Sequence, residues 1–146
     1  MIYRWFKNAF MLAVSTWLLS ASLQVEASRS PEYIKGSTRV TAEEFINLVR
    51  EIPNLIVIDS RIAGDRKQGY VEGSLSLPDV DTTCVSLATK IPTKATPTLF
   101  YCNGVKCGRS AKAVKIALSC GYSKIYWFRG GFEEKRDGCV QSPSRQ

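Results

Sequence analysis

The sequence alternates short apolar runs with segments whose apolar residues recur at helical spacing. The runs at residues 55–58, 98–101 and 125–128 are apolar almost throughout, which is typical of strands buried on both faces of a parallel sheet. A shorter run at residues 75–77 alternates leucine with serine. Strands that alternate with helices through short connections predict a small α/β domain, with a mostly parallel central sheet flanked by helices.

Two segments carry the signals of complete helices. Thr41 and Glu44 form a capping-box pattern, and the apolar residues that follow keep helical spacing until Pro53. A second helix is predicted at residues 110–120, with Gly121 as its C-terminal stop. The remaining segments predict a loop at residues 62–73, a weak helix at 81–91 and a solvated helix or turn at 133–137.

Residues 1–27 have the order of regions typical of a secretory signal peptide. Arg4 and Lys7 precede an apolar run at residues 9–19, and small residues lead to a predicted cleavage site after Ala27. The run is shorter than the ~20 residues that a spanning helix needs, which favours cleavage over the alternative of an uncleaved anchor. We therefore expect export, to the periplasm where the cell has an outer membrane, and no stable membrane span after cleavage.

The rest of the chain is expected to form one basic domain. It divides into an N-terminal leader at residues 28–39, the domain at 40–138 and a C-terminal tail at 139–146. The net charge of the whole chain is +7, which favours small anionic substrates. Export, and the lack of a clustered Lys/Arg patch in the sequence, argue against nucleic acid as a partner.

The chain contains no histidine. This excludes mechanisms that use a histidine base and metal sites of the Cys/His type. The chemistry must then depend on cysteine, carboxylates, lysine, arginine, tyrosine or backbone dipoles. No metal and no cofactor are expected.

The loop after the run at residues 98–101 carries the residues best suited to chemistry. Cys102 follows the strand's carboxyl end, where open α/β sheets bind ligands. A thiolate at Cys102 would be favoured by the loop N–H groups, by the dipole of the next helix and by Arg109. Gly104 and Gly108 would permit the positive φ angles that such a loop needs. By spacing alone, the segment fits equally well a turn whose two cysteines, Cys102 and Cys107, are buried or disulfide-bonded.

Taken together, three stretches of the segment from Val40 to Gly138 resemble the rhodanese family. The first is Ile58-Asp59-Ser60-Arg61, which is similar to the family's strand ending in Asp-x-Arg. The second is residues 69–78, which are similar to the family's Gly-His-Ile-x-Gly-Ala-x-x-x-Pro stretch. The third consists of residues 101–110 with Gly121-Tyr122 and Gly130-Gly131-Phe132-Glu133, and it is similar to the family's active-site loop, the helix that follows it and the final Gly-Gly turn. The resemblance implies the rhodanese fold and sulfur transfer.

By this resemblance, Cys102 is the nucleophile that takes sulfur from a small anionic donor such as thiosulfate. It would carry the sulfur as a persulfide and pass it to a thiol or to cyanide. The expected donor-binding residues are Asn103, Gly104, Val105, Lys106, Gly108, Arg109, Ser110 and Arg61. Asp59 is expected to give structural support.

Two features of the loop leave further functions open. Six residues separate Cys102 from Arg109, against four in common sulfurtransferases of the family, which predicts a wider pocket. Cys107 is a resolving cysteine, an inert loop residue or itself the nucleophile. The alternatives are an exported dithiol/disulfide redox module or arsenate-reductase-like enzyme that uses Cys102 and Cys107, and a non-catalytic sulfur carrier or binding domain. Cys84, Cys120 and Cys139 allow one further disulfide, whose pairing the sequence does not decide.

Overall fold

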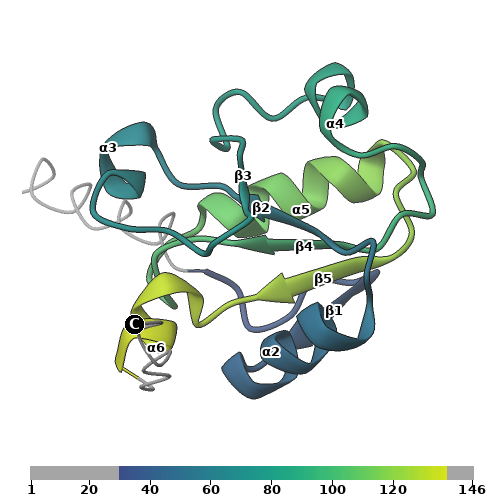
Figure 1. Ribbon diagram of the computed structural model, residues 1–146. Coiled ribbons are helices and arrows are strands. Elements are labelled where there is room, and N and C mark those ends of the chain that lie inside the picture. Colours follow the sequence, from purple (N-terminus) through teal and green to yellow (C-terminus); the bar gives the residue numbers. More distant parts are fainter. Residues whose placement is uncertain (1–29, 138–146) are drawn as a thin grey trace, which may run out of the picture.

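The computed structural model describes residues 30–137, and at its centre is a five-stranded parallel sheet in the order β1-β5-β4-β2-β3 (Figure 1). The strands are β1 (Ser37–Val40), β2 (Ile56–Asp59), β3 (Leu75–Ser76), β4 (Thr98–Tyr101) and β5 (Ile125–Phe128). The helices are α2 (Ala42–Glu51), α3 (Ala63–Arg66), α4 (Cys84–Lys90), α5 (Arg109–Ser119) and α6 (Gly131–Asp137). The predicted signal peptide, the tail at residues 139–146 and Cys139 lie outside the described residues.

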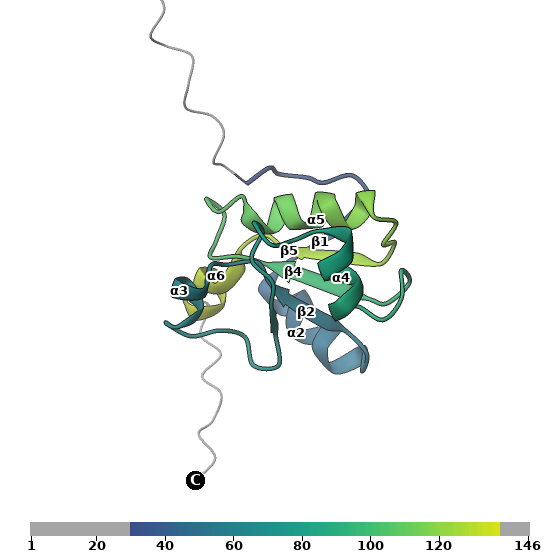
Figure 2. The same ribbon diagram turned by 90° about the horizontal axis from the view of Figure 1, so that it is seen from above.

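The predicted α/β architecture is confirmed, and the packing explains the apolar runs. Alternate strand residues face opposite sides of the sheet: Ile58 and Phe100 pack with the side chains of α4 and α5, whereas Val57 and Leu99 pack with those of α2. Figure 2 shows α5 and α2 on opposite faces of the sheet. Because both faces are covered, the strands need no polar side. Within residues 30–137 the structure contains no helix with the length and apolar character needed to cross a bilayer.

The two helices with complete sequence signals form where predicted, although α5 begins and ends one residue earlier than the expected 110–120. At the start of α2, the Glu44 N–H donates to Thr41 Oγ1 at 3.2 Å, and the Thr41 N–H donates to Glu44 Oε2 at 2.7 Å. Helix α5 ends before Gly121, whose φ of +87° is unfavourable for other residues. The segment at residues 133–137 lies within α6, and the weak helix expected at residues 81–91 is α4.

Two elements differ from the sequence expectation. The first three residues of β1 lie in the expected leader, and the strand pairs in parallel with β5 at the edge of the sheet. Only Val40 of β1 is buried, so this strand has no apolar run to reveal it. The expected loop at residues 62–73 contains α3, a single turn with no buried residue and no side-chain cap at its start. A single turn is too short to show the helical spacing of apolar residues by which a helix is predicted from sequence.

A disulfide between Cys84 and Cys120 joins the two helices on one face of the sheet. Cys84 is the first residue of α4, and Cys120 follows the last residue of α5. The bridge closes a loop with a sequence separation of 36, which restricts the unfolded chain substantially. It therefore holds α4 against the helix that carries Arg109.

Candidate functional site

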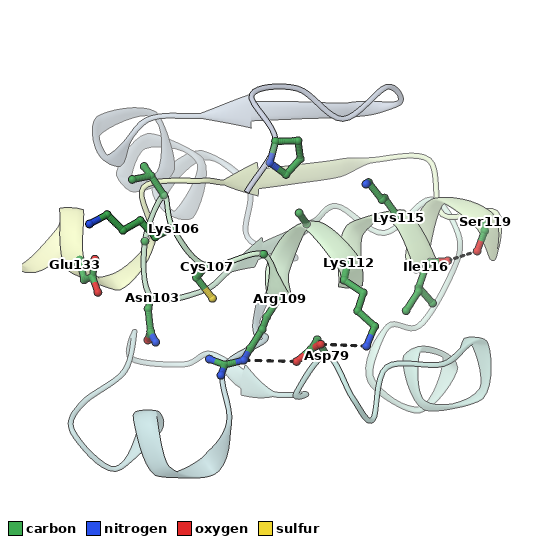
Figure 3. A pocket seen from close by; sticks show the side chains of 15 residues that line it. Asp79, Asn103, Lys106, Cys107, Arg109, Lys112, Lys115, Ile116, Ser119 and Glu133 are labelled. Carbon is green, nitrogen blue, oxygen red and sulfur yellow. Dashed lines mark hydrogen bonds and ion pairs between the residues drawn. The ribbon is translucent and has the colours of Figure 1, made fainter. Parts of the chain in front are cut away.

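The candidate site lies at the carboxyl end of β4, in the loop of residues 102–108 and the first turns of α5. Helices α3 and α6 lie near the same end of the sheet in both views (Figures 1 and 2). A cavity of about 1180 Å³ opens beside the loop and continues along α5 (Figure 3). This volume is somewhat above the range of about 300–1,000 Å³ that is common for ligand pockets.

Cys102 and Cys107 are joined by a disulfide across this loop. Their Cα atoms are 6.2 Å apart, and the N–H of Cys107 donates to the carbonyl of Gly104 at 2.9 Å, which turns the loop back on itself. Cys102 is 1% exposed, whereas Cys107 is half-buried and lines the cavity (Figure 3). The sulfur of Cys102 is therefore buried, but it is bonded, at about 2 Å, to the sulfur of a residue that faces the cavity.

The Gly130-Gly131 turn fixes the backbone at the start of the loop. The N–H of Phe132 donates to the carbonyl of Cys102 at 2.9 Å, and the N–H of Glu133 donates to the carbonyl of Asn103 at 2.7 Å. Gly131 has a φ of +65°, and a Cβ there would collide with the backbone of Cys102 and Asn103. The glycine is thus required both by its own conformation and by the close approach of the loop.

The expected positive φ angles at Gly104 and Gly108 are wrong. Neither glycine is among those with positive φ, and Gly108, the N-cap of α5, has a φ of −80°. Gly104 instead lies beside the carboxylate of Glu133, which would have to move to make room for a Cβ there. Gly108 offers no side chain to cap α5. The first N–H groups of α5, which have no intrahelical acceptor, therefore favour an anion beside the loop.

Arg109 stands at the cavity edge, positioned by two carboxylates. Its Nη1 donates to Asp65 Oδ2 at 3.1 Å, and its Nε lies 3.8 Å from Asp79 Oδ1. Asp65 also accepts from Asn103 Nδ2 at 2.9 Å, and Asp79 pairs with Lys112 at 3.1 Å (Figure 3). The Arg109 side chain is still 36% exposed, so an anion in the cavity can reach it.

The cavity as a whole has a positive lining. The cations that line it are Lys106, Arg109, Lys112 and Lys115, and the carboxylates are Asp79 and Glu133. Lys112 and Lys115 were not among the expected site residues. Their spacing after Arg109 along one side of α5 is the sequence signal that would have found them.

The other expected site residues divide into those that line the cavity and those that are buried behind it. Asn103, Gly104, Val105, Lys106 and Gly108 line the cavity. Ser110 does not, because it is 1% exposed and its Oγ accepts a hydrogen bond from Trp127 Nε1 at 3.1 Å. It supports the first turn of α5 from within.

Arg61 is buried beneath the loop rather than placed in the cavity, so the expected contact with a donor does not fit its position. Its Nε and Nη2 donate to Asp59 at 2.9 and 2.8 Å, and Nη2 also donates to the carbonyl of Gly69 at 2.8 Å. The guanidinium carbon lies 4.4 Å from the centroid of the Phe132 ring. Because these donors are occupied, Arg61 is placed to support the Gly-Gly turn, which it contacts through Phe132.

Asp59, expected from the sequence to give structural support, is the centre of a buried polar network. Besides Arg61, it accepts from Tyr101 Oη at 2.7 Å and from Arg66 Nη1 at 3.0 Å. Burial alone would raise the pKa of Asp59, but the hydrogen bonds from Arg61 and Tyr101 outweigh it and hold the pKa below the ordinary 3.8. Burial raises the pKa of Tyr101, which therefore remains a phenol at neutral pH.

No candidate metal centre exists among residues 30–137, since no three side chains of His, Cys, Asp or Glu converge there as metal ligands would. The groups with chemical capacity are the Cys102–Cys107 pair, the cations of the cavity and the N-terminus of α5. This arrangement suits a sulfur nucleophile that acts on an anion.

Comparisons with known proteins agree with the architecture. A family model described as a rhodanese-like domain matches residues 41–136. Among solved structures, similar chains include the human single-domain sulfurtransferase TSTD1, with a TM-score of 0.57, 18% identity and coverage of 69% of this chain and 96% of its own. The single-domain sulfurtransferase RDL2 of Saccharomyces cerevisiae has a TM-score of 0.59 and 19% identity, and covers 73% of this chain and 94% of its own.

A third similar structure, the BH2092 protein of Bacillus halodurans, has a TM-score of 0.61 and 18% identity, and covers 90% of this chain and 81% of its own. At such identities the likeness to these structures shows a shared fold. No curated protein matches the sequence.

The Asp59 network predicts a specific loss of stability in acid. Because the folded pKa of Asp59 is lowered, its stabilising contribution is complete above the unfolded pKa of about 3.9 and is lost as pH falls through the lower folded value. Tyr101→Phe removes one hydrogen bond that lowers this pKa. We expect the variant to be about 1–3 kcal/mol less stable at pH 7 and to lose less stability between pH 5 and acid.

Urea unfolding of the two proteins at several pH values measures both quantities. Tyr126→Phe is the matched control, since Tyr126 lies on β5 and outside the network. Equal acid sensitivity in the Tyr101→Phe variant and the natural protein would contradict the role given to Tyr101.

Proposed function

This chain belongs to the rhodanese-like domain family, and on that premise we propose that it is a sulfurtransferase that carries sulfur as a persulfide on Cys102. The observation that carries the proposal is the position of Cys102. It follows β4 directly, is bonded to Cys107 in the lining of a positively charged cavity, and is held by the Gly-Gly turn. The human and yeast proteins of similar fold that are named sulfurtransferases support the same activity.

The first half-reaction begins once the Cys102–Cys107 disulfide is reduced. The Cys102 thiolate attacks the outer sulfur of an anionic donor such as thiosulfate. A new S–S bond forms at Cys102, the S–S bond of the donor breaks, and sulfite leaves with the electron pair. Because a thiolate is already the nucleophile, the step needs no general base, which accords with a chain that has no histidine.

The cations of the cavity bind the donor and the departing sulfite. Asp65 and Asp79 hold Arg109 in place, so the donor meets a positioned guanidinium and little side-chain entropy is lost on binding. Lys112 and Lys115 add positive charge along the cavity. The N-terminus of α5 favours the negative charge that the persulfide retains.

In the second half-reaction an acceptor attacks the outer sulfur of the persulfide. A thiol or cyanide forms a bond to that sulfur, and Cys102 leaves as the thiolate, ready for another donor. The acceptor approaches through the cavity, whose volume of about 1180 Å³ admits more than a small ion.

We further propose that the protein works outside the cytoplasm, after cleavage of the signal peptide near Ala27 and without a membrane span. The two disulfides among residues 30–137 support an oxidising compartment, because reducing cytosols disfavour such bonds. In a cell with an outer membrane this compartment would be the periplasm.

The Cys102–Cys107 disulfide favours a second candidate function, a dithiol/disulfide redox module. In that case the two cysteines would exchange electrons with thiols or an oxyanion such as arsenate, and no sulfur would be carried. The two candidates differ in what the loop cysteines hold after reaction with a sulfur donor.

Intact-mass measurement after reaction with thiosulfate tests the proposed nucleophile. We expect reduced Cys107→Ser protein to gain the mass of one sulfur atom and to release sulfite, because its Cys102 thiolate is free to attack. The matched Cys102→Ser variant should gain nothing. A gain in the Cys102→Ser variant would move the nucleophile to Cys107, and no gain in either variant would favour the redox module.

Steady-state kinetics test the role of Arg109. We expect Arg109→Gln to raise the KM for thiosulfate about tenfold, with a smaller change in kcat. A tenfold change corresponds to about 1.4 kcal/mol, which is the size expected for the loss of one charge-assisted hydrogen bond. Lys90→Gln removes a charge from α4 that does not line the cavity, and its KM should not change. Equal effects of the two substitutions would contradict a specific donor contact at Arg109.

A further inference from the structure

We propose that Cys107 resolves the Cys102 persulfide, so that the protein releases the transferred sulfur as hydrogen sulfide and is regenerated by a dithiol reductant. The inference rests on the proposed function and names the fate of its sulfur. It assigns Cys107 a role in each cycle and makes a dithiol, rather than cyanide or a simple thiol, the final electron donor.

The geometry already brings the reacting atoms together. The sulfurs of Cys102 and Cys107 are bonded in the structure, so the folded loop allows bond formation between them. The hydrogen bond from Cys107 N–H to the Gly104 carbonyl closes this turn. A thiolate held at bonding range competes effectively against any acceptor that must diffuse into the cavity.

The proposed step balances in atoms and electrons. The Cys107 thiolate attacks Sγ of Cys102, and a disulfide bond forms between the two residues. The outer sulfur, which is anionic in the persulfide, takes a proton from water. Its bond to Cys102 Sγ breaks, and it leaves with the electron pair as HS⁻. The sulfane sulfur is reduced to sulfide, and the two cysteine sulfurs are oxidised to the disulfide that the structure contains.

Exposure determines how a dithiol reopens the loop. Cys107 lines the cavity, whereas Cys102 is 1% exposed and does not line it. An incoming thiolate therefore attacks Cys107 and expels Cys102 as a thiolate. The second thiol of the reductant then attacks its own mixed-disulfide sulfur and releases Cys107. Over the cycle, thiosulfate and a dithiol give sulfite, hydrogen sulfide and the disulfide of the reductant.

A single-turnover experiment without added thiol tests this inference, because external thiols would release sulfide by themselves. Full-chain protein with Cys139→Ser, which removes the fifth cysteine, is reduced, freed of reductant under anaerobic conditions and mixed with thiosulfate. We expect one sulfide per protein and an intact mass lower by two hydrogen atoms, with Cys102 and Cys107 joined in the peptide map.

Cys107→Ser in the same background should keep the mass of one added sulfur and release no sulfide. The Cys84→Ser/Cys120→Ser variant is the matched control for cysteine loss outside the loop, and it should release sulfide as its parent does. If the parent retains the added sulfur and yields no sulfide while the Cys107→Ser variant loads equally, the inference is overturned and the sulfurtransferase proposal stands.

If neither protein gains sulfur nor releases sulfite, the proposed function fails and the inference fails with it. Sulfide release that persists in the Cys107→Ser variant would also overturn the inference, because the resolving thiol would then lie elsewhere.

Discussion

The buried contact between Asp59 and Arg61 is the interaction on which the site depends. Asp59 ends β2, and its carboxylate also accepts from Tyr101, the residue immediately before Cys102. Arg61 packs on Phe132, whose N–H donates to the carbonyl of Cys102. A buried ion pair is costly to form, and the loss of one partner costs about 3–5 kcal/mol. Here the pair connects the ends of β2 and β4 with the Gly-Gly turn, and all three lie next to Cys102.

This scaffold explains why the polar residues near the loop divide into two sets. Arg61 and Ser110 are fully buried and hold the backbone in place, so they are unavailable to a ligand. Arg109 and Lys112 are partly exposed, and the carboxylate of Asp79 aligns both toward the cavity. A ligand therefore meets cations whose positions are set before it binds. The large cavity and the paired cysteines suit a reaction in which two sulfur compounds enter in turn.

Much of the fold follows from the sequence because the central strands are buried on both sides. Residues 98–101 and 125–128 are apolar almost throughout, and the structure places β4 and β5 there with the same bounds. The edge strand β1 and the single turn α3 bury too little surface to leave such a pattern. Among site residues, Cys102 and the loop were accessible to motif spacing, whereas the burial of Arg61 depends on Phe132, which is distant in sequence.

The direct test of this account is a crystal structure of the Cys107→Ser variant after reaction with thiosulfate. We predict an additional sulfur atom bonded to Sγ of Cys102, facing the cavity and near the first N–H groups of α5. The Gly131 turn should remain against the loop, as it is in the oxidised protein. An additional sulfur on another cysteine, or an unmodified Cys102 at full reaction, would contradict the account.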